Sequence, residues 1–360
     1  MTIKSVSIFL CLILLILCAG CASSDEQSTD LLAKYAELDE KEILETFNEI
    51  TITEESPLSS EDLIMASGAL SEKAGNFTDN DLLSILQADE WSSITKITMI
   101  QLAPKINDGN GIADQKPFEE LIAQPEVDTD VRRTLISNLD MSSSENQNML
   151  EEIIRSEKGP IVGQSLQQIR HTDPKRALKL ADHIIQDHTN YTPAAVKIAI
   201  MIKSLYFEDL VKAESKKDVT KEKEAYIAFC LERFNESQDS VFRDSIIFSL
   251  IDMQDFNAVK EVVNHPEVDD MLKRTCIDRN LRPLIKAVRS NPTKEDVEFI
   301  QTAMEIFPLK EMTDEMKEHL ASNPEYSSPR LNNLIAMMET GGVPADQSRY
   351  ENPPDLRWLE

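Results

Sequence analysis

The chain contains little glycine and few aromatic side chains. Nine glycines among 360 residues are about a third of average usage. Aromatic residues make up 6% of the chain, and two of them are tryptophan. Leu, Ile, Glu and Lys are abundant instead. This composition is typical of a chain that is helical throughout.

Short motifs of the common catalytic classes are also missing. There is no Gly-x-Ser-x-Gly nucleophile elbow, and no glycine-rich phosphate loop follows a strand. After Cys21, no Cys-x-x-Cys pair is present to hold zinc. The sequence therefore predicts no catalytic, cofactor-binding or metal-ligating residue, and no small-molecule substrate.

Basic side chains are scarce. The chain has 37 Lys and Arg against 64 Asp and Glu, a net charge of −27. Such a charge disfavours nucleic acid as a partner, because phosphates need basic side chains. It would suit a basic partner protein or divalent cations. A well-solvated surface is the simpler interpretation.

The N-terminus has the order of an export signal. Lys4 precedes an apolar run, Val6–Leu17, which leads to Ala19-Gly20-Cys21. Small residues before the cysteine fit a signal peptidase, and the cysteine thiol can take a diacylglycerol. The segment resembles the signal peptide of bacterial and some archaeal lipoproteins. We therefore expect residues 1–20 to be removed and Cys21 to carry lipid.

The lipoprotein resemblance has one departure and one alternative. Cys18 stands where leucine is usual in that family. A plain signal-anchor helix is the alternative, but the apolar run is short for a membrane span of about 20 residues. Residues 21–29 are polar and are expected to be a tether.

One stretch of the chain occurs twice. Over twelve positions, Pro125–Ile136 matches Pro266–Ile277 in seven residues at a constant offset of 266 − 125 = 141. In each copy a turn leads to an aspartate, Asp128 or Asp269, that is suited to cap an amphipathic helix. Internal repetition is the first hypothesis for the architecture.

Similar helix starts recur about every 30 to 33 residues, which is a period of helical repeats. One interval is longer, and its excess is the charged insertion Lys212–Glu224, expected to be a loop or the start of a helix. The spacing resembles HEAT-like or armadillo-like repeats over residues 79–310, and the resemblance brings no catalytic motif. The expected starts are Val131, Ile161, Ala195, Phe242 and Leu272.

We therefore predict an all-α fold, an α-α superhelix or solenoid of stacked helix pairs. The expected organisation is a signal peptide at 1–20, a lipidated tether at 21–29, a helical repeat domain at 30–340 and an extended tail at 341–360. Trp358 in the tail is expected to dock on its own domain, or else to bind another molecule.

The best candidate for a cation site is the segment Asp108–Asp114, which looks like the centre of a calcium loop. Ile106 and Pro117 stand where acidic ligands would close such a loop. The alternative is a turn in which Gly109 and Gly111 supply positive φ without an ion.

A second cluster consists of histidines and aspartates with the spacing of one helix face. His183 and Asp187 could share a metal, but no third ligand stands at a fixed spacing, so exposed polar residues are the alternative. Cys230 and Cys276 are expected to be buried free thiols, with a disulfide as the alternative. The other members of the cluster are His171, Asp182 and His188.

The interpretation that follows is a protein-binding scaffold or accessory subunit of the cell envelope, not an enzyme. Lipid on Cys21 would hold it at a membrane, facing outside the cytoplasm, and its repeat surface would contact another envelope protein. The alternative is an extracytoplasmic enzyme whose active site lies in the concave groove of the repeats.

Changing Cys21 to Ser tests the anchor. Because the hydroxyl cannot take the lipid, we expect an unprocessed precursor that retains residues 1–20, seen as a larger mass in whole-cell extracts. A processed variant that still sediments with membranes would contradict lipid attachment at Cys21.

Overall fold

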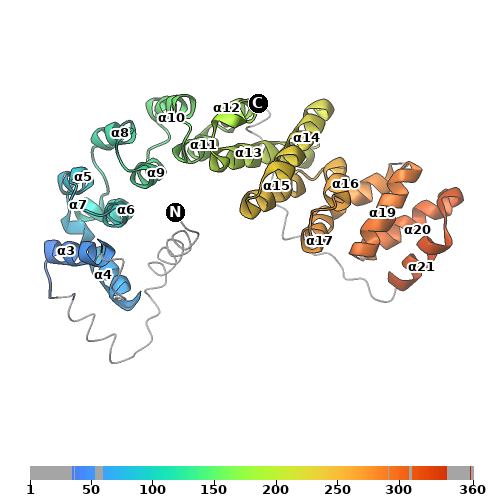
Figure 1. Cartoon of the computed structure of the whole chain (residues 1–360), viewed down its shortest axis with the longest axis horizontal. Coiled ribbons are helices and arrows are strands. Elements are labelled where there is room, and N and C mark those ends of the chain that lie inside the picture. Colours follow the sequence, from blue (N-terminus) through green and yellow to red (C-terminus); the bar gives the residue numbers. More distant parts are fainter. Residues whose placement is uncertain are drawn as a thin grey trace. The chain divides into compact units, whose positions relative to one another are not determined.

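The described part of the chain is helical. A computed structural model describes residues 35, 37–52, 60–290, 292–307, 310–338 and 357, and none of these residues is in a strand. The helices pack on their sequence neighbours (Figure 1). The predicted all-α class and the stacking of an α-α superhelix are confirmed. The signal, the tether, Cys21 and Trp358 lie outside the described residues.

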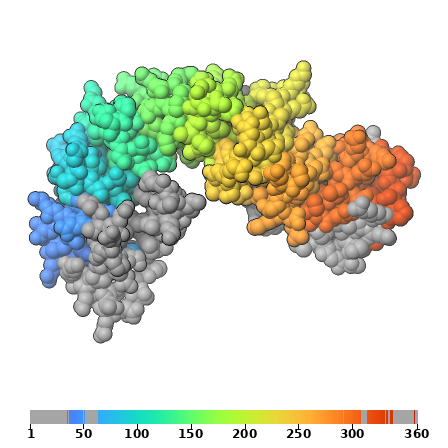
Figure 2. Space-filling view, in the orientation of Figure 1, coloured from blue at the N-terminus to red at the C-terminus, as the bar shows by residue number. Residues whose placement is uncertain are grey.

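The described residues form two compact units, one ending at Ile153 and the other beginning at Ile154. This boundary falls within the single helical domain expected for residues 30–340. Within each unit, the surface colours in Figure 2 follow the order of the sequence. That order reflects helices that contact near neighbours along the chain.

In the first unit, α6 is the central helix and contacts α3, α5 and α9. Its side chains Ile97, Met99 and Ile100 are buried. The elements are α3 (Glu40–Ile52), α4 (Ser60–Lys73), η1 (Ala74–Asn76), α5 (Asp79–Gln87), α6 (Ser93–Leu102), η2 (Ala103–Lys105), α7 (Ile106–Gly109), α8 (Lys116–Ile122), α9 (Thr129–Ser137) and α10 (Ser144–Ser156), whose last three residues belong to the second unit.

In the second unit, each odd-numbered helix from α11 to α21 contacts the next odd-numbered helix, while even-numbered helices cover them. The elements are α11 (Ile161–Thr172), α12 (Pro174–Gln186), η3 (His188–Asn190), α13 (Pro193–Lys212), α14 (Thr220–Glu236), α15 (Ser240–Asp252), α16 (Phe256–Asn264), α17 (Asp270–Arg279), α18 (Leu281–Arg289), α19 (Lys294–Ile306), α20 (Lys310–Ser322), η4 (Pro324–Tyr326) and α21 (Pro329–Met338).

Helix starts are fixed by local capping. The Asp128 carboxylate accepts hydrogen bonds from the backbone N–H groups of Asp130 and Val131, at 2.9 and 3.1 Å. The Asp269 carboxylate accepts from Leu272 N–H at 2.9 Å. Each such cap is worth about 1 kcal/mol because it satisfies a donor that the helix leaves open.

The two copies of the repeated stretch adopt the same local structure. The N–H of Val127 donates to the Gln124 carbonyl, and the N–H of Val268 donates to the His265 carbonyl. In both helices a threonine hydroxyl donates four residues back, from Thr134 to Asp130 and from Thr275 to Met271. The repeat seen in the sequence is therefore also a structural repeat.

The expected helix starts are close to those observed, since α9, α11, α13, α15 and α17 begin within two residues of them. The insertion contains both expected structures. Residues 213–219 form a loop after α13, and α14 begins at Thr220.

Buried polar side chains join neighbouring helices at fixed points. Arg132 in α9 is buried and donates from Nε to the Ile122 carbonyl at 2.8 Å, at the end of α8. Tyr226 in α14 donates to the Ile200 carbonyl in α13 at 2.8 Å. Each bond satisfies a polar group that burial would otherwise leave without a partner.

Single buried positions in each unit should be sensitive to charge. Leu135 and Ile246 are buried, so Leu135→Asp and Ile246→Asp place an unpaired charge in an apolar interface. We expect each to destabilise its own unit by about 3–5 kcal/mol. Denaturant unfolding followed by circular dichroism gives the size, and hydrogen exchange shows which unit opens.

Met271→Asp is the matched control. Its side chain is 79% exposed, and an acidic residue in the first turn of a helix interacts favourably with the helix dipole. The free energy of unfolding of this variant should lie within about 0.5 kcal/mol of that of the parent chain. Equal losses in the buried and exposed variants would contradict the packing described above.

Candidate protein-interaction surface

Large apolar side chains reach solvent on two neighbouring helices of the second unit. Val241 and Phe248 of α15 are 55% and 39% exposed, and Met271 of α17 is 79% exposed. Among the described residues, Ile94 is the other large hydrophobic side chain that is exposed. Apolar exposure is thus concentrated on α15 and α17.

Two of these side chains stand at equivalent positions of their helices. Asp239 caps α15 and Asp269 caps α17, so Val241 and Met271 each stand two residues after a cap. The two helices are in contact. Phe248 stands seven residues after Val241 and therefore lies two turns along the same face.

Apolar side chains at comparable positions also occur on α13, which contacts α15. Met201 is nine residues after the cap Thr192, as Phe248 is nine after Asp239. Met201 and Leu205 are half-buried. We call the set Met201, Leu205, Val241, Phe248 and Met271 the apolar stripe.

Ion pairs border the apolar stripe. Arg243 of α15 pairs with Glu267 at 2.6 Å, and its guanidinium lies 4.0 Å from the centre of the Phe234 ring. Arg279 of α17 pairs with Asp252 of α15 at 3.0 Å. The Arg279–Asp252 pair joins the two helices, and Arg243 joins α15 to the residue before the α17 cap. An apolar centre with a polar rim is the usual composition of a protein interface.

A buried lysine holds the helices beside the stripe. The Lys203 side chain of α13 is 6% exposed and pairs with Asp182 of α12 at 2.8 Å and with Glu222 of α14. Its ammonium also lies 5.3 Å from the centre of the Phe207 ring. Three helices therefore meet at one cation.

The charged insertion joins the same network. Lys217 donates from Nζ to the Tyr206 hydroxyl at 2.6 Å, and this bond raises the pKa of Lys217. Lys223 pairs with Asp255 at 2.9 Å, which ties α14 to the start of α16. The insertion thus contributes to the packing of the second unit.

The candidate calcium segment is organised by a carboxylate outside it. Asp79 accepts the backbone N–H groups of Ala113 and Asp114, both at 2.9 Å, and the side-chain amide of Asn107 at 2.7 Å. Gly109 and Gly111 have φ of 81° and 76°. The segment therefore contains a glycine turn that is held by hydrogen bonds to Asp79. Within the described ranges, no three His, Cys, Asp or Glu side chains are placed to hold a metal ion.

The histidine cluster does not converge. His183 lies edge-on to Tyr191, and His188 lies edge-on to Phe229, with ring centres 6.2 and 5.2 Å apart. The aspartates pair elsewhere, Asp182 with Lys203 at 2.8 Å and Asp187 with Lys158 at 4.0 Å. The backbone carbonyl of His171 accepts a bond from Arg357 at 2.8 Å.

Cys230 and Cys276 are free and buried, as the sequence predicts. Burial raises the pKa of the Cys230 thiol to about 12, against a lowering effect of the Tyr226 hydroxyl. Burial also raises the pKa of Cys276. Both thiols stay protonated at neutral pH, so neither is a nucleophile.

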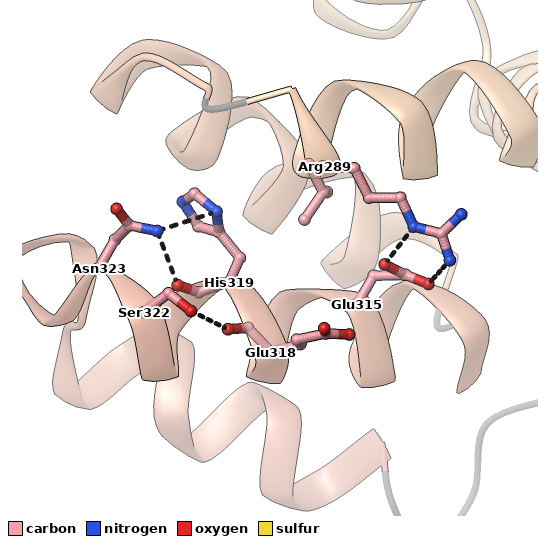
Figure 3. Close-up of a pocket in the computed structure, with 7 residues that line it drawn as sticks. Arg289, Glu315, Glu318, His319, Ser322 and Asn323 are labelled. Atoms are coloured by element: carbon pink, nitrogen blue, oxygen red, sulfur yellow. Dashed lines mark hydrogen bonds and ion pairs between the residues drawn. The ribbon is translucent and has the colours of Figure 1, made fainter.

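A pocket of about 330 Å³ lies between α18 and α20 (Figure 3). Arg289 and Glu315 form a two-pronged ion pair across it, with Nε 2.9 Å from a carboxylate oxygen. His319 Nε2 has no hydrogen-bond partner among the described residues, but that atom is buried. Because the nitrogen is not exposed to the pocket, a ligand in the pocket cannot reach it.

The sequence did not single out the stripe. No motif in the sequence marks Val241, Phe248 or Met271. A local signal was available, because the second residue after an Asp cap normally faces solvent, and valine and methionine are unusual there.

In the described ranges, no helix has the length and apolar character to cross a membrane.

No protein-family model, curated protein or solved structure matches the chain.

The Lys203 network gives a test of its structural role. Lys203→Met removes the buried cation, and the two carboxylates it leaves are 38% and 42% exposed and can be hydrated. The double change Asp182→Asn with Glu222→Gln keeps the buried cation and removes its partners. We expect the free energy of unfolding to fall by about 3–5 kcal/mol in the double variant, and by clearly less in Lys203→Met. The opposite order in urea unfolding would contradict this account.

Proposed function

We propose that the chain is a lipid-anchored binding protein of the cell envelope whose apolar stripe contacts a partner protein. The observation that carries the proposal is the exposure of Val241, Phe248 and Met271 on the neighbouring helices α15 and α17. Exposed apolar side chains grouped on a surface with a polar rim mark interaction sites.

The rigidity of the face supports this role. The stripe lies on helices joined by the Arg279–Asp252 pair, and the neighbouring α13 is joined to α12 and α14 through Lys203. A surface that is already ordered loses less conformational entropy when a partner binds. The long apolar side chains then supply the favourable burial.

A lipid on Cys21 would strengthen such binding. A molecule held at a membrane surface meets other membrane proteins at a high effective concentration, so that a modest interface is sufficient. The acidic balance of the chain, 37 basic against 64 acidic residues, favours a partner with a basic rim around its own apolar contact.

Photocrosslinking in intact cells tests the stripe. A photoreactive amino acid at Met271 should form a discrete protein adduct, because a partner on the stripe would cover that position. The same amino acid at exposed Asn264 on α16 is the matched control and should give no such adduct. Phe248→Asp should reduce the Met271 adduct at least about fivefold, as expected for losing more than 1 kcal/mol of contact energy.

The outcomes separate the two functions considered. An adduct that forms equally from Met271 and Asn264 would contradict a specific stripe interface. The absence of any adduct, together with turnover of a small molecule by the purified chain, would favour the enzyme instead.

A further inference from the structure

The first unit contains a groove of about 580 Å³ between the start of α3 and the face of α5. Its base is apolar, because the lining residues Leu44, Phe77 and Ile85 are otherwise buried in the core. Trp91, in the loop after α5, also lines the groove and is half-exposed. The groove lining therefore includes apolar side chains and one tryptophan.

The rest of the lining is acidic. Asp39, Glu40, Asp81 and Glu90 stand against a single base, Lys41, a balance of 1 − 4 = −3. Lys41 is directed to Glu45 of its own helix, 3.5 Å away. Among the described residues, none of the four carboxylates has a salt bridge. Hydrogen bonds lower the pKa of Glu40, and Lys73, outside the lining, helps to lower it. A cation in the groove would thus meet carboxylates that form no salt bridge.

Most of these carboxylates are held in place by neighbouring groups. Asp39 accepts the N–H of Glu42 at 2.8 Å, and Asp81 accepts the N–H of Thr78 at 2.8 Å. Glu40 accepts the side-chain amide of Asn76. Each still has free acceptor positions, because a carboxylate has about four. The acidic rim is therefore largely preformed.

The combination selects one kind of ligand. A tryptophan ring attracts a cation over its face, and an aliphatic stem can lie on an apolar base while its charged end reaches carboxylates. Lysine and arginine side chains have both parts. The Trp91 indole N–H donates to no described residue, so it is also available to a backbone carbonyl of a bound peptide.

We propose that this groove binds a lysine or arginine side chain of a basic peptide segment on a partner protein. The groove lies in the first unit and the apolar stripe in the second. The proposal therefore does not depend on the stripe or on the crosslinking result, and either site can fail while the other stands.

Binding of a labelled Leu-Arg-Leu-Arg peptide to the full chain, followed by fluorescence anisotropy, tests the groove. Trp91→Ala should weaken binding about three- to tenfold, from loss of the cation–π contact and the apolar wall. Glu90→Gln should weaken it about threefold. Glu90 suits this test because its side chain is exposed and has no partner among the described residues.

Glu261→Gln is the matched control, since it removes the same charge from an exposed position on α16 in the second unit. It should leave binding unchanged. Circular dichroism checks that each variant is folded, and Trp91→Phe, which keeps an aromatic face, should bind between the parent and Trp91→Ala. If Trp91→Ala fails to fold, Trp91→Phe and Glu90→Gln decide the question.

Two results would overturn the proposal. Equal losses in Glu90→Gln and Glu261→Gln would mean that the peptide responds to the net charge of the chain and not to the groove. Tight binding of spermidine in place of the peptide, with the same dependence on Trp91, would assign the groove to a free amine and not to a protein segment.

Discussion

The fold depends on the burial of apolar helix faces against near neighbours in the sequence. In the second unit, the odd-numbered helices contact one another in order, so each contact closes only a short length of chain. This arrangement needs no long-range strand pairing, and its stability is distributed along the helices. Buried polar groups such as Arg132 and Lys203 add fixed points, because each must keep its partners once it is removed from water. On α15 and α17, this packing leaves Val241, Phe248 and Met271 exposed.

The fold was predictable wherever a local interaction determines it. The caps Asp128 and Asp269 are readable because an aspartate side chain and the backbone three residues ahead interact whatever lies elsewhere. The same holds for the helix period and for the burial of Cys230 and Cys276. The division at Ile153–Ile154 was not predictable. The position of the division depends on how extensively neighbouring helices contact one another. The periodicity of apolar side chains in the sequence does not indicate the extent of these contacts.

The sites were harder to predict than the helices for the same reason. The groove near Trp91 combines the start of α3, the face of α5 and the loop after it, and no sequence spacing brings these segments together. The spacing of residues in the segment Asp108–Asp114 does not indicate Asp79, which lies about thirty residues earlier in the chain. The Asp79 carboxylate accepts the backbone hydrogen bonds that hold this segment. The stripe is an intermediate case. Its exposed positions follow from the caps Asp239 and Asp269, but the contact between α15 and α17 does not.

The two surfaces differ in the physical interaction that each uses, and this difference has a consequence for their behaviour. Burial of Phe248 and Met271 is an apolar contribution that dissolved salt weakens little. Attraction between the groove carboxylates and a cation is electrostatic, and at exposed positions it is screened over about 8 Å at physiological ionic strength. Rising salt should therefore release a basic segment from the first unit while leaving the contact on the second unit in place. For a partner that used both surfaces, the acidic groove would mainly raise the rate of association, because charge acts at longer range than apolar contact. The apolar stripe would mainly slow dissociation.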